Sequence, residues 1–233
     1  RQRQMCIRDR FTDVSEPWGF SGGGKAAFAD YDGDGWMDLY AGKLFHNEQG
    51  KAMSPVESSG LPGGEAIWGD YDNDQRPDLF FFTGAGGLYR NMGEGKFEQV
   101  DFPELPTVNS RGAVWGDFNQ DGRLDLFVGG YEVWEQRVHP DVIFLNQPDG
   151  SFKEVWRSPE GACYSARGVA AADLNEDGKI DVYVSNYRLQ PNHLWLNQGE
   201  GKFEESAESY QAAGIGDGGL SLIHISEPTR RSY

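Results

Sequence analysis

The sequence predicts an all-β protein, a β-propeller fragment of about four four-stranded blades. Two observations predict this fold class. First, an apolar strand, an acidic nine-residue loop, a second apolar strand, a third strand and a glycine-bearing turn occur in that order four times. Second, the loops begin at Asp30, Asp70, Asp117 and Asp173, so their starts are 40, 47 and 56 residues apart. Four short strands in roughly 40 to 50 residues are typical of a propeller blade.

The blades are expected to cover residues 25–62, 63–108, 109–164 and 165–205, within a repeat region at residues 11–219. Because this region opens with the end of one blade and stops where another would begin, we expect a larger propeller of about seven blades. Residues 1–10 and 220–233 do not continue the repeat and carry an excess of basic residues. Both segments resemble translated sequencing read-through, and we expect them to be non-native.

Within each blade, the strand before the loop ends in a small residue and the third strand ends in Asn. Innermost strands crowd around a propeller axis, where small residues let neighbouring blades approach. The small residues are Ala29, Gly69, Gly116 and Ala172. The Asn residues, which we expect to shape the hairpin turns that follow them, are Asn47, Asn91, Asn146 and Asn197. The extra length of the later repeats falls between second and third strands, at residues 132–141 and 186–192.

Composition limits the partners of the chain. Its 233 residues include 37 acidic and 21 basic side chains, for a formal net charge of −16. This charge argues against binding to nucleic acid or to an anionic membrane surface. No apolar run approaches the roughly 20 residues of a membrane-spanning helix, so no transmembrane segment is expected. The two cysteines, Cys6 and Cys163, provide no disulfide framework.

The four loops carry oxygen-bearing side chains at positions 1, 3, 5 and 9. This alternation lets a short turn wrap a hard cation, and calcium takes roughly six to eight oxygen ligands. Because the side chain at position 7 varies, we expect a main-chain carbonyl as the ligand there. With one ion per loop, we expect up to four Ca²⁺ ions. The predicted side-chain ligands are Asp30, Asp32, Asp34, Asp38, Asp70, Asp72, Asp74, Asp78, Asp117, Asn119, Asp121, Asp125, Asp173, Asn175, Asp177 and Asp181. The predicted carbonyl ligands are Trp36, Arg76, Arg123 and Lys179.

Other interpretations of the loops are weaker. An EF-hand needs Glu at position 12 and flanking helices, whereas position 12 is here an apolar strand residue in every loop. Zinc is disfavoured because no Cys or His joins the clusters, and magnesium because it keeps its waters. An acidic turn that binds nothing is the structural alternative, although carboxylates this close repel one another. The second loop has Gln75 in place of glycine and Pro77 before its last Asp, so we expect it to bind most weakly.

The loops resemble those of FG-GAP/VCBS repeats, as in the integrin α-subunit propeller. The fuller phrase, with LYRN or LWLN, GEGKF and FTDV, is similar to bacterial VCBS-repeat proteins that often carry an ASPIC/UnbV domain, relatives of cartilage acidic protein. The resemblance covers residues 11–219, with Gln75 as its departure. It implies calcium ions that brace the blades, and a protein that is secreted, periplasmic or on the cell surface.

We expect a non-catalytic interaction or adhesion module with a protein or glycan ligand. The competing hypothesis is the propeller domain of a secreted polysaccharide lyase or hydrolase. That hypothesis needs a catalytic constellation outside the loops, and His46, His139 and His193 have no Ser, Cys or paired-carboxylate partner in a recognisable motif.

Several aromatic and basic residues allow further hypotheses. Trp134 and Trp156 are candidates for carbohydrate binding if they are exposed. Arg111 and Arg167 stand at the starts of two inner strands. We expect them to brace acidic neighbours, and the alternative is that they meet an anionic ligand at the propeller mouth. The matching inner-strand residues Trp68 and Trp115 are expected to pack between blades.

Overall fold

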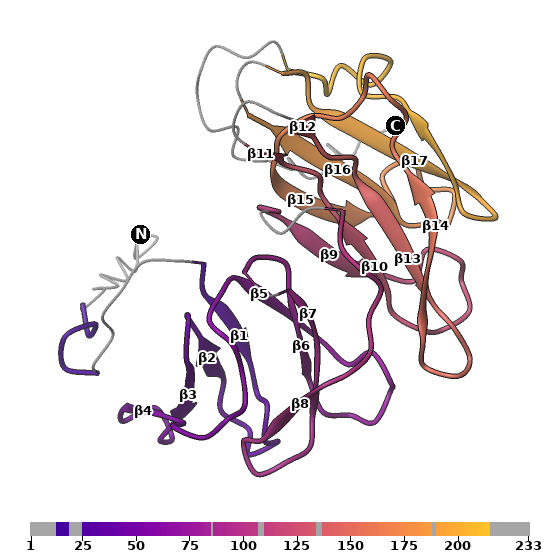
Figure 1. Ribbon diagram of the computed structural model, residues 1–233. Helices are drawn as coiled ribbons and strands as arrows, with labels where there is room; N and C mark the ends of the chain where they lie inside the picture. The colour runs from indigo at the N-terminus through magenta and orange to yellow at the C-terminus, as the bar shows by residue number, and fades with distance from the viewer. Residues whose placement is uncertain are drawn as a thin grey trace, which may run out of the picture.

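The computed structural model describes residues 13–18, 25–84, 86–106, 110–133, 137–187 and 190–214 (Figure 1). Within these ranges every regular element is a β-strand, and the strands form four four-stranded antiparallel sheets and one two-stranded hairpin. The prediction of an all-β fold made of four-stranded, blade-like sheets is confirmed. The expected read-through segments, residues 1–10 and 220–233, lie outside the described residues.

The first two sheets are meanders of consecutive strands, in which the strand before the acidic loop lies at one edge. The first sheet consists of β1 (Ala27–Ala29), β2 (Asp38–Tyr40), β3 (Leu44–Asn47) and β4 (Met53–Pro55). The second sheet consists of β5 (Ala66–Gly69), β6 (Asp78–Phe81), β7 (Gly87–Asn91) and β8 (Phe97–Gln99). In each of them the acidic loop joins the edge strand to the next strand.

The last two sheets repeat this arrangement, and the fourth has longer strands. The third sheet consists of β9 (Ala113–Gly116), β10 (Asp125–Val128), β13 (Val142–Asn146) and β14 (Phe152–Arg157). The fourth sheet consists of β15 (Ala166–Ala172), β16 (Asp181–Asn186), β17 (His193–Gly199) and β18 (Lys202–Glu205). The insertion between β10 and β13 forms a small hairpin of β11 (Glu132–Val133) and β12 (Arg137–Val138).

The sheets follow one another through the molecule, and each middle sheet packs against a neighbour on both faces (Figure 1). Strand β6 shows how the sequence achieves this. Leu79 and Phe81 pack against the first sheet, whereas Phe80 and Phe82 pack against the third. Successive residues of a strand point to opposite faces, so a strand buried on both sides needs an unbroken apolar run. Each of these side chains is at most 2 % exposed, and such burial contributes about 1.5–3 kcal/mol per side chain.

The inner strands of neighbouring sheets approach each other closely at the small residues. A Cβ atom at Gly69 would lie 2.5 Å from Nε1 of Trp115, and one at Gly116 would lie 3.2 Å from Cγ2 of Ile180, which directly precedes β16 of the fourth sheet. The expected role of these two glycines is therefore confirmed. Trp68 and Trp115 pack between sheets as expected, and Nε1 of Trp68 donates a hydrogen bond to the carbonyl of Ala27 at 3.1 Å.

Candidate metal centre

Each acidic loop is closed by the Asp at its first position. We number the loops 1 to 4, at residues 30–38, 70–78, 117–125 and 173–181. In loop 3, Oδ1 of Asp117 accepts a hydrogen bond from the N–H of Asp121 and Oδ2 accepts one from the N–H of Gly122, both at 2.9 Å. The first Asp of the other loops accepts the equivalent pair. The four sequences therefore fold into the same turn.

Positions 3 and 5 extend the same pattern. In every loop the position-3 side chain accepts a hydrogen bond from the N–H of position 5, and the position-5 carboxylate accepts one from the N–H of position 7. The turn needs a left-handed residue at position 6, where φ is +83° at Gly122 and +70° at Gln75. Gln75 adopts this conformation at a cost of about 1 kcal/mol relative to glycine.

The Asp at position 9 lies beneath each loop and is fully buried, with an exposed fraction of 0 % in all four loops. In loop 3, Oδ2 of Asp125 accepts a hydrogen bond from the N–H of Phe118, and Oδ1 accepts one from the N–H of Asn146, both at 2.9 Å. The other loops have the equivalent two bonds. A single carboxylate thus connects the loop, the second strand and the end of the third strand.

Burial raises the pKa of the position-9 carboxyl group in loops 1, 2 and 3. The pKa of Asp78 is raised to about 7 and that of Asp125 to about 6, because burial disfavours the charged form more than the two backbone hydrogen bonds favour it. Neighbouring loop carboxylates raise both values further. Burial raises the pKa of Asp38 as well. A cation beside these carboxylates would favour their charged form and relieve the repulsion.

The Asn at the end of the third strand connects each loop to the next sheet. Nδ2 of Asn146 in the third sheet donates a hydrogen bond to the carbonyl of Tyr71, which is position 2 of loop 2, at 2.7 Å. Asn91 makes the same bond to Tyr31 of loop 1, and Asn197 makes it to Phe118 of loop 3, each at 2.8 Å. The sequence predicted only a hairpin role for these Asn residues, and the bond between sheets was missed.

The hairpin role is present in three of the four turns. Oδ1 of Asn91 and of Asn197 each accepts a hydrogen bond at 2.9 Å from the glycine N–H two residues later, and Asn47 accepts one from Gly50. Two residues after Asn146 stands Pro148, which has no N–H to donate. Oδ1 of Asn146 accordingly has no hydrogen-bond partner.

In loops 1 and 2 the carboxylate oxygens lie close enough together to share one ion. Carboxylate oxygens of Asp30, Asp32 and Asp38 lie within 4.8 Å of one another, and so do those of the matching residues of loop 2. Loops 3 and 4 have Asn at position 3, whose amide oxygen is also a hard ligand. Hard oxygen donors in this number suit Ca²⁺, so the residues fit the predicted ion. The individual ligands, including the carbonyls at position 7, stay predictions.

The side chains at position 7 neutralise a neighbouring carboxylate, which the sequence analysis did not foresee. Nζ of Lys179 lies 2.8 Å from Oδ2 of Asp177. Arg76 and Arg123 form ion pairs with the position-5 Asp of their own loops. The exception is loop 1, where position 7 is a half-exposed Trp.

A second charged contact separates the loops into two kinds. In loop 2, Nε of Arg90 lies 2.7 Å from Oδ2 of Asp72, and Nη2 lies 3.2 Å from Oδ2 of Asp74. Arg90 is on β7, directly before the Asn that ends the third strand. In loop 1 the residue at this place is His46, whose Nδ1 lies 3.1 Å from Oδ2 of Asp32. The expectation that no His joins the acidic clusters is therefore wrong for loop 1, because the third strand brings His46 over the loop. In loops 3 and 4 the same place is held by the apolar residues Leu145 and Leu196.

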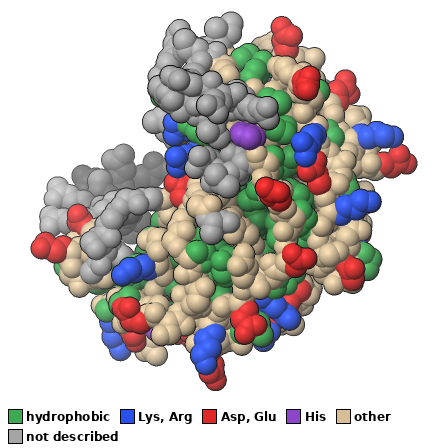
Figure 2. Space-filling view, in the orientation of Figure 1, with side chains coloured by type: hydrophobic (Ala, Val, Ile, Leu, Met, Phe, Trp, Pro, Cys, Tyr) green, Lys and Arg blue, Asp and Glu red, His purple; other side chains and the backbone are tan. Residues whose placement is uncertain are grey.

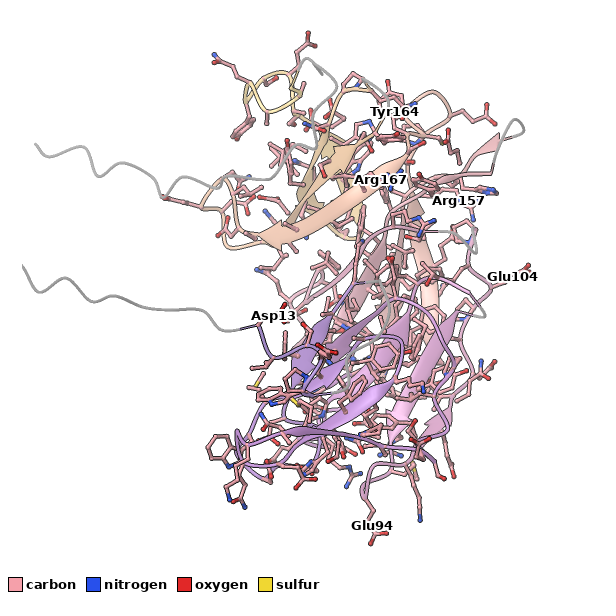
Figure 3. The ribbon with its side chains drawn as sticks, turned by 90° about the vertical axis from the view of Figure 1, so that its left-hand side faces the viewer. Asp13, Glu94, Glu104, Arg157, Tyr164 and Arg167 are labelled. Carbon is pink, nitrogen blue, oxygen red and sulfur yellow. The ribbon has the colours of Figure 1, made fainter. Side chains whose placement is uncertain are left out.

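At the opposite ends of the inner strands, basic side chains gather around one carboxylate. Nζ of Lys25 lies 3.6 Å and Nη1 of Arg111 lies 3.8 Å from the carboxylate of Glu65. The guanidinium of Arg167, labelled in Figure 3, lies 4.3 Å from the ring of Tyr187. The bracing role expected for Arg111 is confirmed. We call the following residues the basic cluster: Lys25, Glu65, Arg111, Tyr131, Arg167 and Tyr187.

The remaining candidates from the sequence have packing roles or lie outside the described residues. Trp156 packs against Trp195, with ring centroids 4.9 Å apart, and contacts Phe203, so the expectation of an exposed carbohydrate-binding ring at this position is wrong. Trp134 lies outside the described residues. His193 is only 3 % exposed, and its Nδ1 lies 3.7 Å from Oδ2 of Asp141.

A family model for FG-GAP-like repeats matches residues 70–128 and 133–184. The chain contains two FG-GAP-like repeats. The first matched range contains loops 2 and 3, and the second contains loop 4. Over 59 residues the chain is also 37 % identical to cartilage acidic protein 1 of Xenopus tropicalis, an alignment that covers 24 % of this chain and 9 % of that protein.

Two solved structures are similar to this FG-GAP repeat chain at low identity. An Agrocybe aegerita lectin, described as recognising non-reducing terminal N-acetylglucosamine, aligns with a TM-score of 0.48 and 20 % identity over 77 % of this chain and 51 % of its own. The V. cholerae biofilm matrix protein Bap1 aligns with a TM-score of 0.48 and 16 % identity over 76 % of this chain and 27 % of its own. The chain therefore spans about half or less of the proteins it matches. Within its described residues, no helix is long and apolar enough to cross a membrane.

Proposed function

We propose that this chain is a calcium-braced propeller segment that serves as a non-catalytic interaction or adhesion module outside the cell. One observation carries the proposal. The same oxygen-bearing turn is built four times, each time with a buried Asp beneath it, and in three loops its backbone is hydrogen-bonded to the next sheet. A turn that served only as a connection would not need four closely placed acidic or amide side chains.

The residues of the chain supply the scaffold, and the ion would supply positive charge. The position-1 Asp closes the turn, the position-9 Asp fixes it to the second and third strands, and positions 3 and 5 complete the oxygen set. An ion that binds only the folded chain adds stability by mass action. Because the loops are connected to neighbouring sheets, that stability would extend to the contacts between blades.

The proposed location outside the cytoplasm follows from the same chemistry. Extracellular calcium modules bind with dissociation constants of roughly 10⁻⁴ to 10⁻³ M, which match the calcium concentration outside cells. Acidic side chains are also spread over the visible surface rather than gathered in one place (Figure 2). A secreted, periplasmic or cell-surface protein is thus proposed, with a protein or glycan as the ligand.

Thermal unfolding with and without calcium tests the proposal. At calcium concentrations ten times the dissociation constant, each site adds about 1.4 kcal/mol. Three or more such sites should raise the Tm by about 10 °C or more, since 1 kcal/mol corresponds to about 2–4 °C at this chain length. A chelator should reverse the rise in Tm, and the same concentration of magnesium should produce a much smaller rise. A melting curve that calcium leaves unchanged would contradict the proposal.

A catalytic role in a secreted polysaccharide lyase or hydrolase is the competing proposal. The observation that favours it is the basic cluster, because cationic side chains at the start of inner strands could receive an acidic saccharide. Activity measurements on acidic polysaccharides separate the two proposals. Turnover that disappears in Arg167→Ala, while calcium-dependent stability persists, would favour the enzyme.

A further inference from the structure

The loops differ in how their carboxylates are neutralised, and we infer that Arg90 acts as a built-in counter-ion for loop 2. In this arrangement loop 2 keeps its shape without calcium, and the chain takes up three ions rather than four. The inference rests on the proposed function, because it concerns which of the proposed calcium loops depend on the ion.

The contacts of Arg90 support this role. Its guanidinium bridges two carboxylates of the same loop, with Nε 2.7 Å from Asp72 and Nη2 3.2 Å from Asp74. The side chains of both Asp residues are only 19 % exposed. Asp74 also pairs with Arg76, so two fixed cations already share the side-chain oxygens at positions 3 and 5. A calcium ion on those oxygens would lie close to both guanidinium groups and be repelled by them.

Loops 3 and 4 have a neutral side chain and no second cation at positions 3 and 5. Their position-3 residue is Asn, and Nδ2 of Asn119 donates a hydrogen bond to Oδ2 of Asp121 at 2.7 Å. Nδ2 of Asn175 does the same to Asp177 at 3.2 Å. A neutral amide therefore bridges positions 3 and 5 in these loops, where Arg90 bridges them in loop 2.

The residue at position 3 and the residue on the third strand change together along the chain. Where position 3 is Asp, the strand residue is basic, as in Asp32 with His46 and Asp72 with Arg90. Where position 3 is Asn, the strand residue is Leu, as in Asn119 with Leu145. The same combination recurs in the fourth sheet. The strand residue thus matches the charge of the loop above it.

Loops 2 and 3 have the same net charge, so the difference that we infer in their calcium binding depends on where the positive charges lie. Loop 2 has four carboxylates with Arg76 and Arg90, which gives −4 + 2 = −2. Loop 3 has three carboxylates with Arg123, which gives −3 + 1 = −2. The difference is that a second guanidinium contacts the ligand oxygens of loop 2. Loop 1 has an imidazole there rather than a guanidinium.

The test is calcium titration calorimetry combined with melting curves in calcium and in chelator, on the chain and on Arg90→Leu. Leu is the residue that the third and fourth sheets already have at this place. We expect three bound ions in the unchanged chain and four in Arg90→Leu. We also expect the variant to melt lower than the unchanged chain in chelator, but to gain about 3 °C more from calcium.

Two further variants control the experiment. Arg157→Leu removes a bidentate ion pair with Glu154, at 2.7 and 2.8 Å, within strand β14; Arg157 is labelled in Figure 3. It should leave the ion count and the calcium-induced rise unchanged. Asn119→Asp combined with Leu145→Arg gives loop 3 the residues of loop 2, and should lower the ion count to two even if Arg90→Leu folds poorly.

The outcomes separate the inference from the function on which it rests. Four ions in the unchanged chain, or equal non-zero counts in the unchanged chain and Arg90→Leu, would overturn the inference and leave the calcium module standing. A calcium-induced rise that becomes smaller in Arg90→Leu would also overturn it, since Arg90 would then assist binding. No ion in any variant would overturn both the inference and the proposed function.

Discussion

The two ends of the inner strands hold neighbouring sheets together by different means. At one end, loops rich in carboxylates lie over fully buried Asp residues and carry more acidic than basic side chains. At the other end, the basic cluster contains its own carboxylate, because Glu65 is paired with Lys25 and with Arg111. The guanidinium of Arg167 lies between two tyrosine rings. The comparison teaches that one set of strands can carry an edge with an excess of acidic charge and an edge with an excess of basic charge.

The largest effect is expected at the buried carboxylate of loop 3. Asp125→Ala leaves the N–H groups of Phe118 and Asn146 without their acceptor in a buried site. Each unsatisfied donor costs about 1–3 kcal/mol, so the free energy of unfolding should fall by about 3–5 kcal/mol. Urea unfolding in calcium measures it. Asp149→Asn, in an exposed turn of the same sheet, is the control and should cost less than about 1 kcal/mol. If Asp125→Ala lowered the free energy of unfolding as little as the control does, the prediction for the buried carboxylate would be wrong.

An intermediate effect is expected in the basic cluster. Arg167→Ala removes cation–π contacts with Tyr131 and Tyr187, at 5.3 and 4.3 Å. Such contacts contribute about 0.5–1 kcal/mol each, so the variant should lose about 1–2 kcal/mol of unfolding free energy. The loss should be the same in calcium and in chelator, because no loop residue is involved. A loss that appears only in chelator would show that the two ends of the strands are coupled.

The smallest effect is expected at position 6 of loop 2. Gln75→Gly removes a side chain from a left-handed backbone position with φ of +70°. After the entropic cost of glycine, the chain should gain about 0.5 kcal/mol of stability. Gly122→Gln is the reciprocal variant, and its Cβ would meet nothing within 4 Å, so its loss reflects the backbone alone. Chemical unfolding of both variants should show opposite signs, and changes of the same sign would refute the strain argument.

The sequence was sufficient to predict the fold and the close approach of the inner strands. An alternation of apolar strands and acidic turns fixes four-stranded sheets, since each apolar run must be buried on both faces. The need for small residues at Gly69 and Gly116 followed from crowding around an axis, and the structure bears it out. The left-handed position of Gln75 was also predictable, because three glycines occupy the equivalent place.

The sequence was not sufficient for the contacts that cross the repeat. Arg90 lies 16 residues beyond Asp74, and nothing in the local spacing places a guanidinium on the loop. The signal that could have found it is the joint change of position 3 and the residue before the shared Asn. The bonds from Asn91, Asn146 and Asn197 to the preceding loops were missed because they depend on how sheets stack.

Those Asn bonds give the assembly a direction. The carbonyl of Tyr71 is held by Asn146, and that of Phe118 by Asn197, so each turn receives its last partner from a blade made later. As the chain leaves the ribosome, a turn is therefore finished only after the third strand of the following blade has emerged. The hydrogen bonding of each acidic loop would therefore be completed one blade later than its synthesis. A chain stalled on the ribosome would end in a loop that lacks its last hydrogen bond.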